Sequence, residues 1–243
     1  MSAPKEYLEL KAKHQVPHEN LQPFYIDNIF TQDALDELYV YIDKHRSHFA
    51  LRDWGVRTWH VPMPEIIKSQ ATAAILKHMP GLEFYESAFG KYSTDWGLKN
   101  KLSPHADYPR IRRPIYKRHL DDLGIKSHED DHRPQSIVLD IQIKHDVDWP
   151  IFVEYEKFQL SDNQGLVFSG TQQIHWRNYM PVGTHVDMLF VHFVWADYRR
   201  QIDNQREIIN ERADFICKDI NLWSGEELLD SEETLYAHKK FKL

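Results

Sequence analysis

Cysteine, glycine and long apolar runs are all scarce in this sequence. The only cysteine among 243 residues is Cys217, so neither an intrachain disulfide nor a thiolate metal cluster can form, as is typical of a reducing compartment. The 9 glycines form no G-x-G-x-x-G or G-x-x-x-x-G-K-[ST] motif, which argues against a nucleotide-binding fold. No stretch approaches the roughly 20 apolar residues that span a bilayer, and the start, MSAPKEYLELKAKHQ, lacks the apolar run of a signal peptide. We therefore expect a cytoplasmic protein without a membrane partner.

An excess of positive charge is also missing. The formal net charge is −7 and the pI is about 6.1, so nothing indicates a general attraction to nucleic acid. Hydrophobic residues make up 42% of the chain and aromatic residues 13%, which is enough for one sizeable core. Because no repeat, low-complexity tract or linker divides the sequence, we expect a single domain over 1–243.

Helical patterns lie at both ends of the chain, and strand patterns lie between them. In TQDALDELYVYIDKH, Thr31 is a candidate N-cap, and PEIIKSQATAAILKHMPG predicts a second helix that begins near Pro64. A long amphipathic helix is expected at 196–220, and short strands at 82–93, 135–146, 150–160, 164–170 and 185–196. Strands at this spacing with no helices between them predict antiparallel sheets. The expected fold is mainly β with flanking α: a jelly roll with its core at about 82–196, a helical N-terminal lead-in and a long C-terminal helix.

The segment 135–146, QSIVLDIQIKHD, alternates between apolar and polar residues. One face carries Ile137, Leu139, Ile141 and Ile143, and the other carries Ser136, Asp140, Gln142 and Lys144. This alternation predicts a strand with one buried face and one solvated face.

The pattern His-x-Asp occurs four times in this histidine-rich chain, at His105/Asp107, His119/Asp121, His128/Asp130 and His185/Asp187. The second and third pairs lie in YKRHLDDLGIKSHEDDHRP, a charged stretch without strand periodicity, where we expect a solvated surface. Metal ligands need a rigid platform. His105/Asp107 is preferred because it follows a predicted strand and directly precedes this charged stretch.

A third ligand is expected from a later strand of the jelly roll. In GLVFSGTQQIHWRNYMPVG an apolar strand reaches Gly170, and His175 follows on the next element. Two histidines and one carboxylate bind one face of an octahedral Fe(II) and leave three positions for substrate and oxygen. The set His105, Asp107 and His175 fits this pattern. Two alternatives stay open: a site made by His185 and Asp187 with His175, and a structural role for all these histidines without metal.

KYSTDWGLKNKLSPHAD together with GLVFSGTQQIHWRNYMPVGTHVDMLFVHFVW resembles the Fe(II)/2-oxoglutarate-dependent oxygenase superfamily, in particular its prolyl-hydroxylase-like branch. The resemblance covers about 82–196 and the lead-in FYIDNIFTQDALDELYVYI. It implies a double-stranded β-helix, Fe(II) held by His105, Asp107 and His175, 2-oxoglutarate as co-substrate, and O2. Because halogenating members carry a small residue at the position of Asp107, its presence favours hydroxylation or a related C–H oxidation.

The resemblance also implies a cationic anchor for the distal carboxylate of 2-oxoglutarate. Alignment on PVGTH places His185 where the family has Lys or Arg. A planar guanidinium offers a carboxylate two parallel donors and imidazole does not, so Arg177 is a second candidate and Lys144 a weaker third. Tyr92 matches the family tyrosine that contacts the co-substrate.

The substrate is expected to be a small anionic molecule such as an amino acid, and a protein side chain is also possible. Basic residues of the segment 108–134, among them Arg110, Arg112 and Arg113, suit an anionic group, although a solvated loop explains them equally well. Two further alternatives stay open. One is a cupin-like metalloenzyme without 2-oxoglutarate, and the other is a jelly-roll module, metal-binding or metal-free, without redox chemistry.

Overall fold

The computed structural model describes residues 2–13, 21–45, 50–51, 56–59, 63–93, 102–105, 137–196 and 206–219. In 50–51, 56–59, 102–105 and 206–210 it describes the backbone alone.

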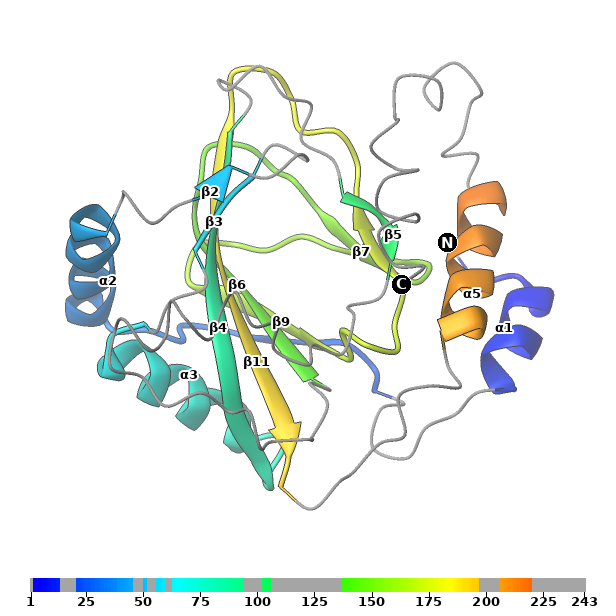
Figure 1. The fold of residues 1–243 in the computed structure, drawn as a ribbon, viewed down its shortest axis with the longest axis horizontal. Helices are drawn as coiled ribbons and strands as arrows, with labels where there is room; N and C mark the ends of the chain where they lie inside the picture. Colours follow the sequence, from blue (N-terminus) through cyan, green and yellow to red (C-terminus); the bar gives the residue numbers. More distant parts are fainter. Residues whose placement is uncertain are drawn as a thin grey trace.

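Two antiparallel β-sheets form the centre of the molecule (Figure 1). The large sheet has the order β1-β9-β6-β11-β4-β3-β2. Its strands are β1 (Phe24–Ile26), β2 (Ala50–Leu51), β3 (Val56–Trp59), β4 (Leu82–Ser93), β6 (Ile137–His145), β9 (Gln164–Phe168) and β11 (His185–Trp195). The small sheet has the order β5-β10-β7-β8, with β5 (Leu102–His105), β7 (Ile151–Val153), β8 (Glu156–Phe158) and β10 (His175–Arg177).

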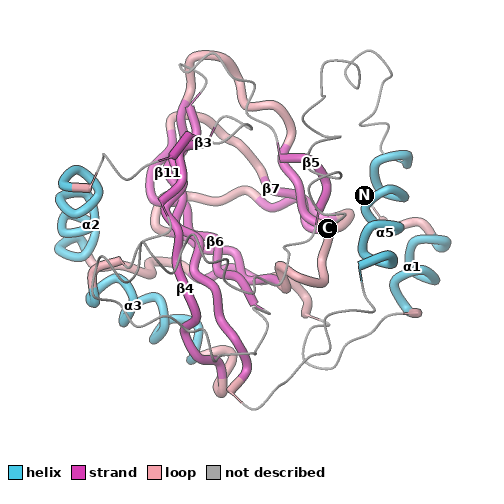
Figure 2. The backbone as a smooth tube through the Cα atoms, in the orientation of Figure 1, coloured by secondary structure: helices cyan, strands magenta, loops and turns pink. Residues whose placement is uncertain are grey.

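The strand order identifies the fold as a jelly roll. The chain crosses between the sheets from β4 to β5, from β5 to β6 and from β6 to β7, and again from β8 through β9 and β10 to β11. The order β4, β11, β6, β9 in the large sheet therefore corresponds strand by strand to β5, β10, β7, β8 in the small one. This is the double-stranded β-helix arrangement, and Figure 2 shows the two sheets facing each other. The predicted fold class is confirmed.

Helices α2 (Gln32–Lys44) and α3 (Glu65–Leu76) cover the outer face of the large sheet (Figure 1). Leu38 and Ile67 pack there against Leu139 and Leu189 in one buried cluster. The predicted cap is present, since the hydroxyl oxygen of Thr31 accepts a hydrogen bond from the backbone N–H of Ala34 at 3.4 Å. The apolar face of each helix is thus buried against the large sheet and shields this side of the sheet from solvent.

Strand β6 corrects the prediction of a half-solvated strand. Its isoleucines face the helices as expected, but Asp140 is only 5% exposed and Gln142 is fully buried. The small sheet covers this second face, where Val138 joins the cluster that fills the space between the sheets. The alternation of polar and apolar residues therefore does not mean that the polar face is exposed to solvent. It reflects a polar interior between the two sheets.

Helices α1 (Lys5–Ala12) and α5 (Arg206–Asp219) lie together beside the small sheet, on the right of Figure 1. Tyr7 of α1 and Ile216 of α5 share a buried cluster with Trp176 of β10. The C-terminal helix predicted for 196–220 is described over Arg206–Asp219, and the rest of that range, apart from Ala196, lies outside the described residues. In the part of the chain that the structure describes, no helix is long and apolar enough to cross a membrane.

Candidate functional site

The antiparallel register of the small sheet brings two of the three predicted metal ligands to the same place. β5 ends at His105 and β10 begins at His175, and these two residues are register partners. Cα atoms of such partners lie about 4.5–5.5 Å apart. Residues separated by 70 positions in the sequence are thus neighbours across one strand pair. The side chain of His105 and all of Asp107 lie outside the described residues.

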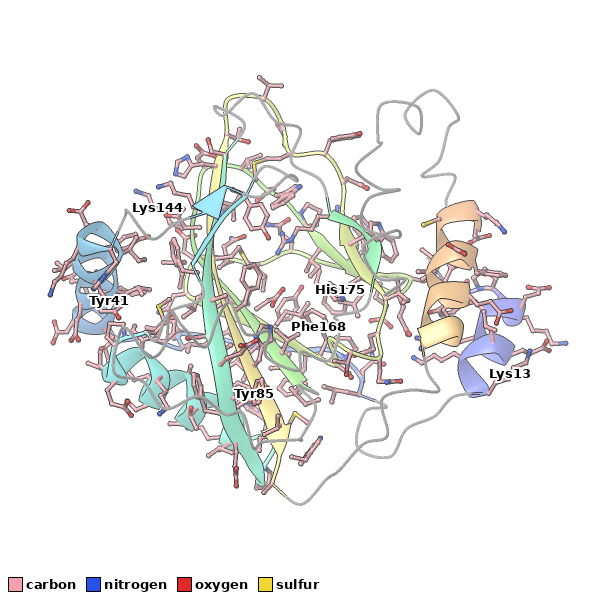
Figure 3. All side chains as sticks on the ribbon, in the orientation of Figure 1. Lys13, Tyr41, Tyr85, Lys144, Phe168 and His175 are labelled. Carbon is pink, nitrogen blue, oxygen red and sulfur yellow. The ribbon has the colours of Figure 1, made fainter. Side chains whose placement is uncertain are left out.

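His175 is held in one orientation by a backbone carbonyl and an aromatic ring. Its side chain is buried, and Nδ1 lies 3.1 Å from the backbone carbonyl oxygen of Gln173. Because a carbonyl only accepts hydrogen bonds, Nδ1 carries the proton and Nε2 carries the lone pair that a metal needs. The ring of Phe168 packs against the imidazole at a centroid distance of 4.9 Å, and Figure 3 shows both side chains between the sheets.

Arg177 lies two residues after His175 on β10, and therefore on the same inner face. The residue is 4% exposed, and its guanidinium stacks over the ring of Trp149 at 4.7 Å and donates to the carbonyl oxygen of Trp149. Burial lowers the pKa of Arg177, and the nearby Tyr92 and Asp140 offset part of this effect. Within the described parts of the chain, Arg177 forms no ion pair with a carboxylate. The interior thus contains a desolvated cation suited to an anionic ligand.

Tyr92 lies near Arg177, and both side chains contact Trp149. Tyr92 is buried at the end of β4, and its ring meets the ring of Trp149 edge-on at 4.9 Å. Trp149 therefore packs against both Arg177 and Tyr92, the two predicted co-substrate residues, and keeps them close together.

The other two candidate anchors lie elsewhere. Lys144 is exposed and is the register partner of Asp187, and Figure 3 shows it on the side of α2, apart from His175. A register shift in the pairing of β6 with β11 places Lys144 there instead of inside. The imidazole Nδ1 of His185 lies 2.5 Å from a carboxylate oxygen of Asp146, at the partly exposed start of β11.

The alternative site made by His185, Asp187 and His175 does not form. Asp187 shares its strand face with Leu189, which packs under the helices on the outer side of the large sheet. Its carboxylate lies 3.8 Å from the ammonium of Lys91, and burial raises the pKa of Asp187 while Lys91 lowers it. Among the described residues, no three His, Cys, Asp or Glu side chains are grouped closely enough to hold a metal ion.

A buried pair on the inner face of the large sheet was missed by sequence reasoning, which treated His192 as an ordinary strand histidine. Nδ1 of His192 lies 3.6 Å from Oε1 of Glu86, and both side chains are largely buried. The signal in the sequence was a charged residue at an inward position of an otherwise apolar strand.

The remaining candidates cannot be placed. Arg110, Arg112 and Arg113, together with His119 and His128, lie outside the described residues.

No protein-family model matches the sequence, and a search of curated proteins finds no significant match. Among solved structures, the fold is similar to the collagen prolyl hydroxylase vCPH of Paramecium bursaria Chlorella virus-1 in complex with 2-oxoglutarate, with 10% identity, a TM-score of 0.49 and coverage of 72% of this chain and 96% of that chain. It is also similar to a prolyl-4-hydroxylase of Pseudomonas putida, with 14% identity, a TM-score of 0.48 and coverage of 74% and 93%. A third similar structure is HygX of Streptomyces hygroscopicus with nickel, 2-oxoglutarate and hygromycin B bound. The identity is 8%, the TM-score is 0.49, and the match covers 85% of this chain and 94% of that chain. At these identities the likeness concerns the course of the backbone and leaves the chemistry to the residues of this chain.

Proposed function

We propose that this chain is a non-haem iron oxygenase that couples decarboxylation of 2-oxoglutarate to hydroxylation of a small molecule. The observation that carries the proposal is the register of His105 with His175, because it places two imidazole-bearing positions side by side on adjacent strands. Asp107 follows two residues after His105 and completes the set of two histidines and one carboxylate that is typical of Fe(II). The Nδ1 hydrogen bond of His175 to a backbone carbonyl supports its role as an Nε2 ligand.

Arg177 and Tyr92 fit the distal carboxylate of 2-oxoglutarate. The guanidinium is buried, lies on the inner face two residues beyond His175 and forms no ion pair with a carboxylate among the described residues. A bound dicarboxylate would supply that partner, and the Tyr92 hydroxyl would donate to the same group. His185 is the weaker choice because its imidazole already faces Asp146.

When bound, Fe(II) and 2-oxoglutarate would supply the oxidising chemistry, in which O2 converts 2-oxoglutarate to succinate and CO2 and one oxygen atom enters a substrate C–H bond. The residues of this chain would bind the metal, orient the co-substrate and exclude water. His105, Asp107 and His175 would hold the metal and leave positions open for the co-substrate and O2. Arg177 and Tyr92 would orient the co-substrate, and the aromatic side chains of Trp149 and Phe168 would keep water away from it.

We infer that the substrate is a small molecule with an anionic group, such as an amino acid, recognised by Arg110, Arg112 and Arg113. These arginines begin three residues after Asp107, and three residues span at most about 11 Å. Their closeness to Asp107 in the sequence supports this assignment. The whole chain, 1–243, would act as one catalytic domain.

The test is formation of succinate from 2-oxoglutarate by the purified protein with Fe(II) in air, followed by mass spectrometry. We expect slow turnover without substrate and none after His175→Ala. A matched control is His145→Ala, which removes a histidine from the partly exposed end of β6, where it contacts Asp162. Succinate formation that survives His175→Ala, or that never occurs, would contradict the proposal.

A further inference from the structure

Trp149 and the end of strand β10 hold each other through two reciprocal hydrogen bonds. The indole Nε1–H of Trp149 donates to the backbone carbonyl oxygen of Asn178 at 2.7 Å, and the guanidinium of Arg177 donates to the backbone carbonyl oxygen of Trp149. The guanidinium carbon also lies 4.7 Å from the centroid of the Trp149 ring. Trp149 is 2% exposed and Arg177 is 4% exposed. These contacts, which we call the Trp149 clamp, join the side chain of each partner to the backbone of the other.

The Trp149 clamp lies where the backbone pairing of two strands stops. Among the described residues, the pairing of β7 with β10 ends at Phe152 and Trp176. Pro150, the residue after Trp149, has no N–H with which to extend the ladder. The side chains of the clamp therefore take over from the backbone in joining the segment before β7 to the end of β10.

The segment 146–149 is also attached to β11 at its other end. The backbone N–H of Asp146 donates to the carbonyl oxygen of His185 at 3.2 Å, and the backbone N–H of His185 donates to the Asp146 carboxylate at 2.7 Å. The segment is thus fixed to β11 at its start and to β10 at its end. The ring of Trp149 cannot move away from Arg177 unless one of these attachments breaks.

The Trp149 clamp fixes the position of a cation relative to His175. Arg177 lies two residues beyond His175 on β10, which is about 7 Å along the strand. A free arginine side chain samples many rotamers, and its charged end moves with them. Here the guanidinium lies between the Trp149 ring and the sulfur of the fully buried Met188, 3.9 Å from Nη2. The distance from the imidazole of His175 to the guanidinium is therefore set by packing.

We propose that Trp149 is a positioning residue that holds Arg177 and thereby makes the site select 2-oxoglutarate over its six-carbon homologue, 2-oxoadipate. The inference rests on the proposed oxygenase function. A keto diacid held at its keto end beside His175 must place its far carboxylate at the guanidinium, and a fixed guanidinium fits one chain length. Binding to donors that are already in place also avoids the cost of ordering them. When the clamp is weakened, the guanidinium can retreat to meet a longer diacid.

The experiment is an anaerobic calorimetric titration of 2-oxoglutarate and of 2-oxoadipate into the protein with Fe(II), so that binding is measured without turnover. Trp149→Phe keeps an aromatic face but removes the indole N–H and part of the ring. We expect it to raise the Kd of 2-oxoglutarate roughly tenfold. The Kd of 2-oxoadipate should change less, so the ratio of the two constants should fall at least about fivefold.

The matched control is Trp176→Phe. Trp176 is the residue before Arg177, is 3% exposed, and packs on the opposite face of β10 with Tyr7 and Phe152. The same substitution at a similarly buried position therefore reports any general loss of stability. Trp176→Phe should leave the ratio of the two constants as in the parent. A ratio that Trp149→Phe leaves unchanged, or that both variants lower equally, would overturn the inference.

The parent protein distinguishes the failure of this inference from the failure of the proposed function. If it binds neither keto diacid in the presence of Fe(II), the proposed oxygenase function fails and the inference fails with it. If it binds both with similar affinity, keto-acid binding stands and the selection by Trp149 is wrong. Should Trp149→Phe fail to fold, Trp149→Tyr takes its place, because it removes the same N–H and keeps a larger ring, and the ratio should fall in this variant as well.

Discussion

Replacing Arg177 with Gln tests whether the buried guanidinium anchors 2-oxoglutarate. Arg177 is 4% exposed, and its guanidinium contacts a backbone carbonyl, a thioether and an aromatic face, with Tyr92 and Asp140 close enough to stabilise its charge. A hydrogen bond to a charged group contributes about 1.5–3 kcal/mol. Since about 1.4 kcal/mol corresponds to a factor of ten, Arg177→Gln should weaken 2-oxoglutarate binding roughly 10- to 150-fold.

The assay is an anaerobic titration of 2-oxoglutarate at saturating Fe(II), with thermal unfolding of the same samples. Burial lowers the pKa of Arg177, so the ligand-free protein holds this charge at a cost, and 2-oxoglutarate should raise the melting temperature of the parent more than that of the variant. His185→Ala is the matched control and should bind 2-oxoglutarate nearly as the parent does. If His185→Ala were the damaging change and Arg177→Gln harmless, the anchor would be the histidine. Binding should then weaken as pH rises through about 6.5, where an imidazole loses its charge.

Three further predictions follow from the same arrangement. Alanine at any of His105, Asp107 or His175 should abolish Fe(II) binding in an anaerobic metal titration, whereas alanine at His119 or His128 should leave it intact; the opposite result would refute the ligand set. Neutralising Arg110, Arg112 and Arg113 together should weaken substrate binding and the coupling of succinate to product but preserve turnover without substrate; an unchanged KM and coupling would leave 108–134 as solvated surface. Glu154→Gln should reduce the free energy of unfolding, measured in urea, by about 3–5 kcal/mol. The change leaves the buried Arg212 without the carboxylate that lies 2.5 Å from its guanidinium. A loss no larger than that caused by Glu156→Gln, a change at an exposed residue, would contradict this.

Much of the fold could be predicted because it depends on local patterns. The strand 82–93 and the cap at Thr31 occur as predicted, since each is written in consecutive residues. The inward polar face of β6 could not be predicted, because Asp140 and Gln142 look like solvated residues until a second sheet is placed over them. Burial of that face depends on β7 and β10, which lie far away in the sequence.

The candidate site was predictable to a similar extent. Strand context selected His105 and His175, which the small sheet pairs with each other, and their role as metal ligands stays a prediction. Lys144 shares a face with Gln142 in the sequence pattern, but Lys144 is exposed while Gln142 is buried, and a register shift against β11 lies between the two residues. Glu86 and His192 were passed over because their pairing spans more than 100 residues of sequence, so the charged residue at an inward position did not point to its partner.

The central claim is that this protein binds Fe(II) and 2-oxoglutarate at one site. Adding both to the protein without oxygen and recording the visible absorption spectrum tests it most directly. We expect a weak charge-transfer band that needs both additions, reports chelation of the metal by the keto acid, and disappears in His175→Ala. A band that forms without 2-oxoglutarate, or no band when Fe(II) is demonstrably bound, would contradict the claim and favour a jelly-roll metal site without 2-oxoglutarate chemistry.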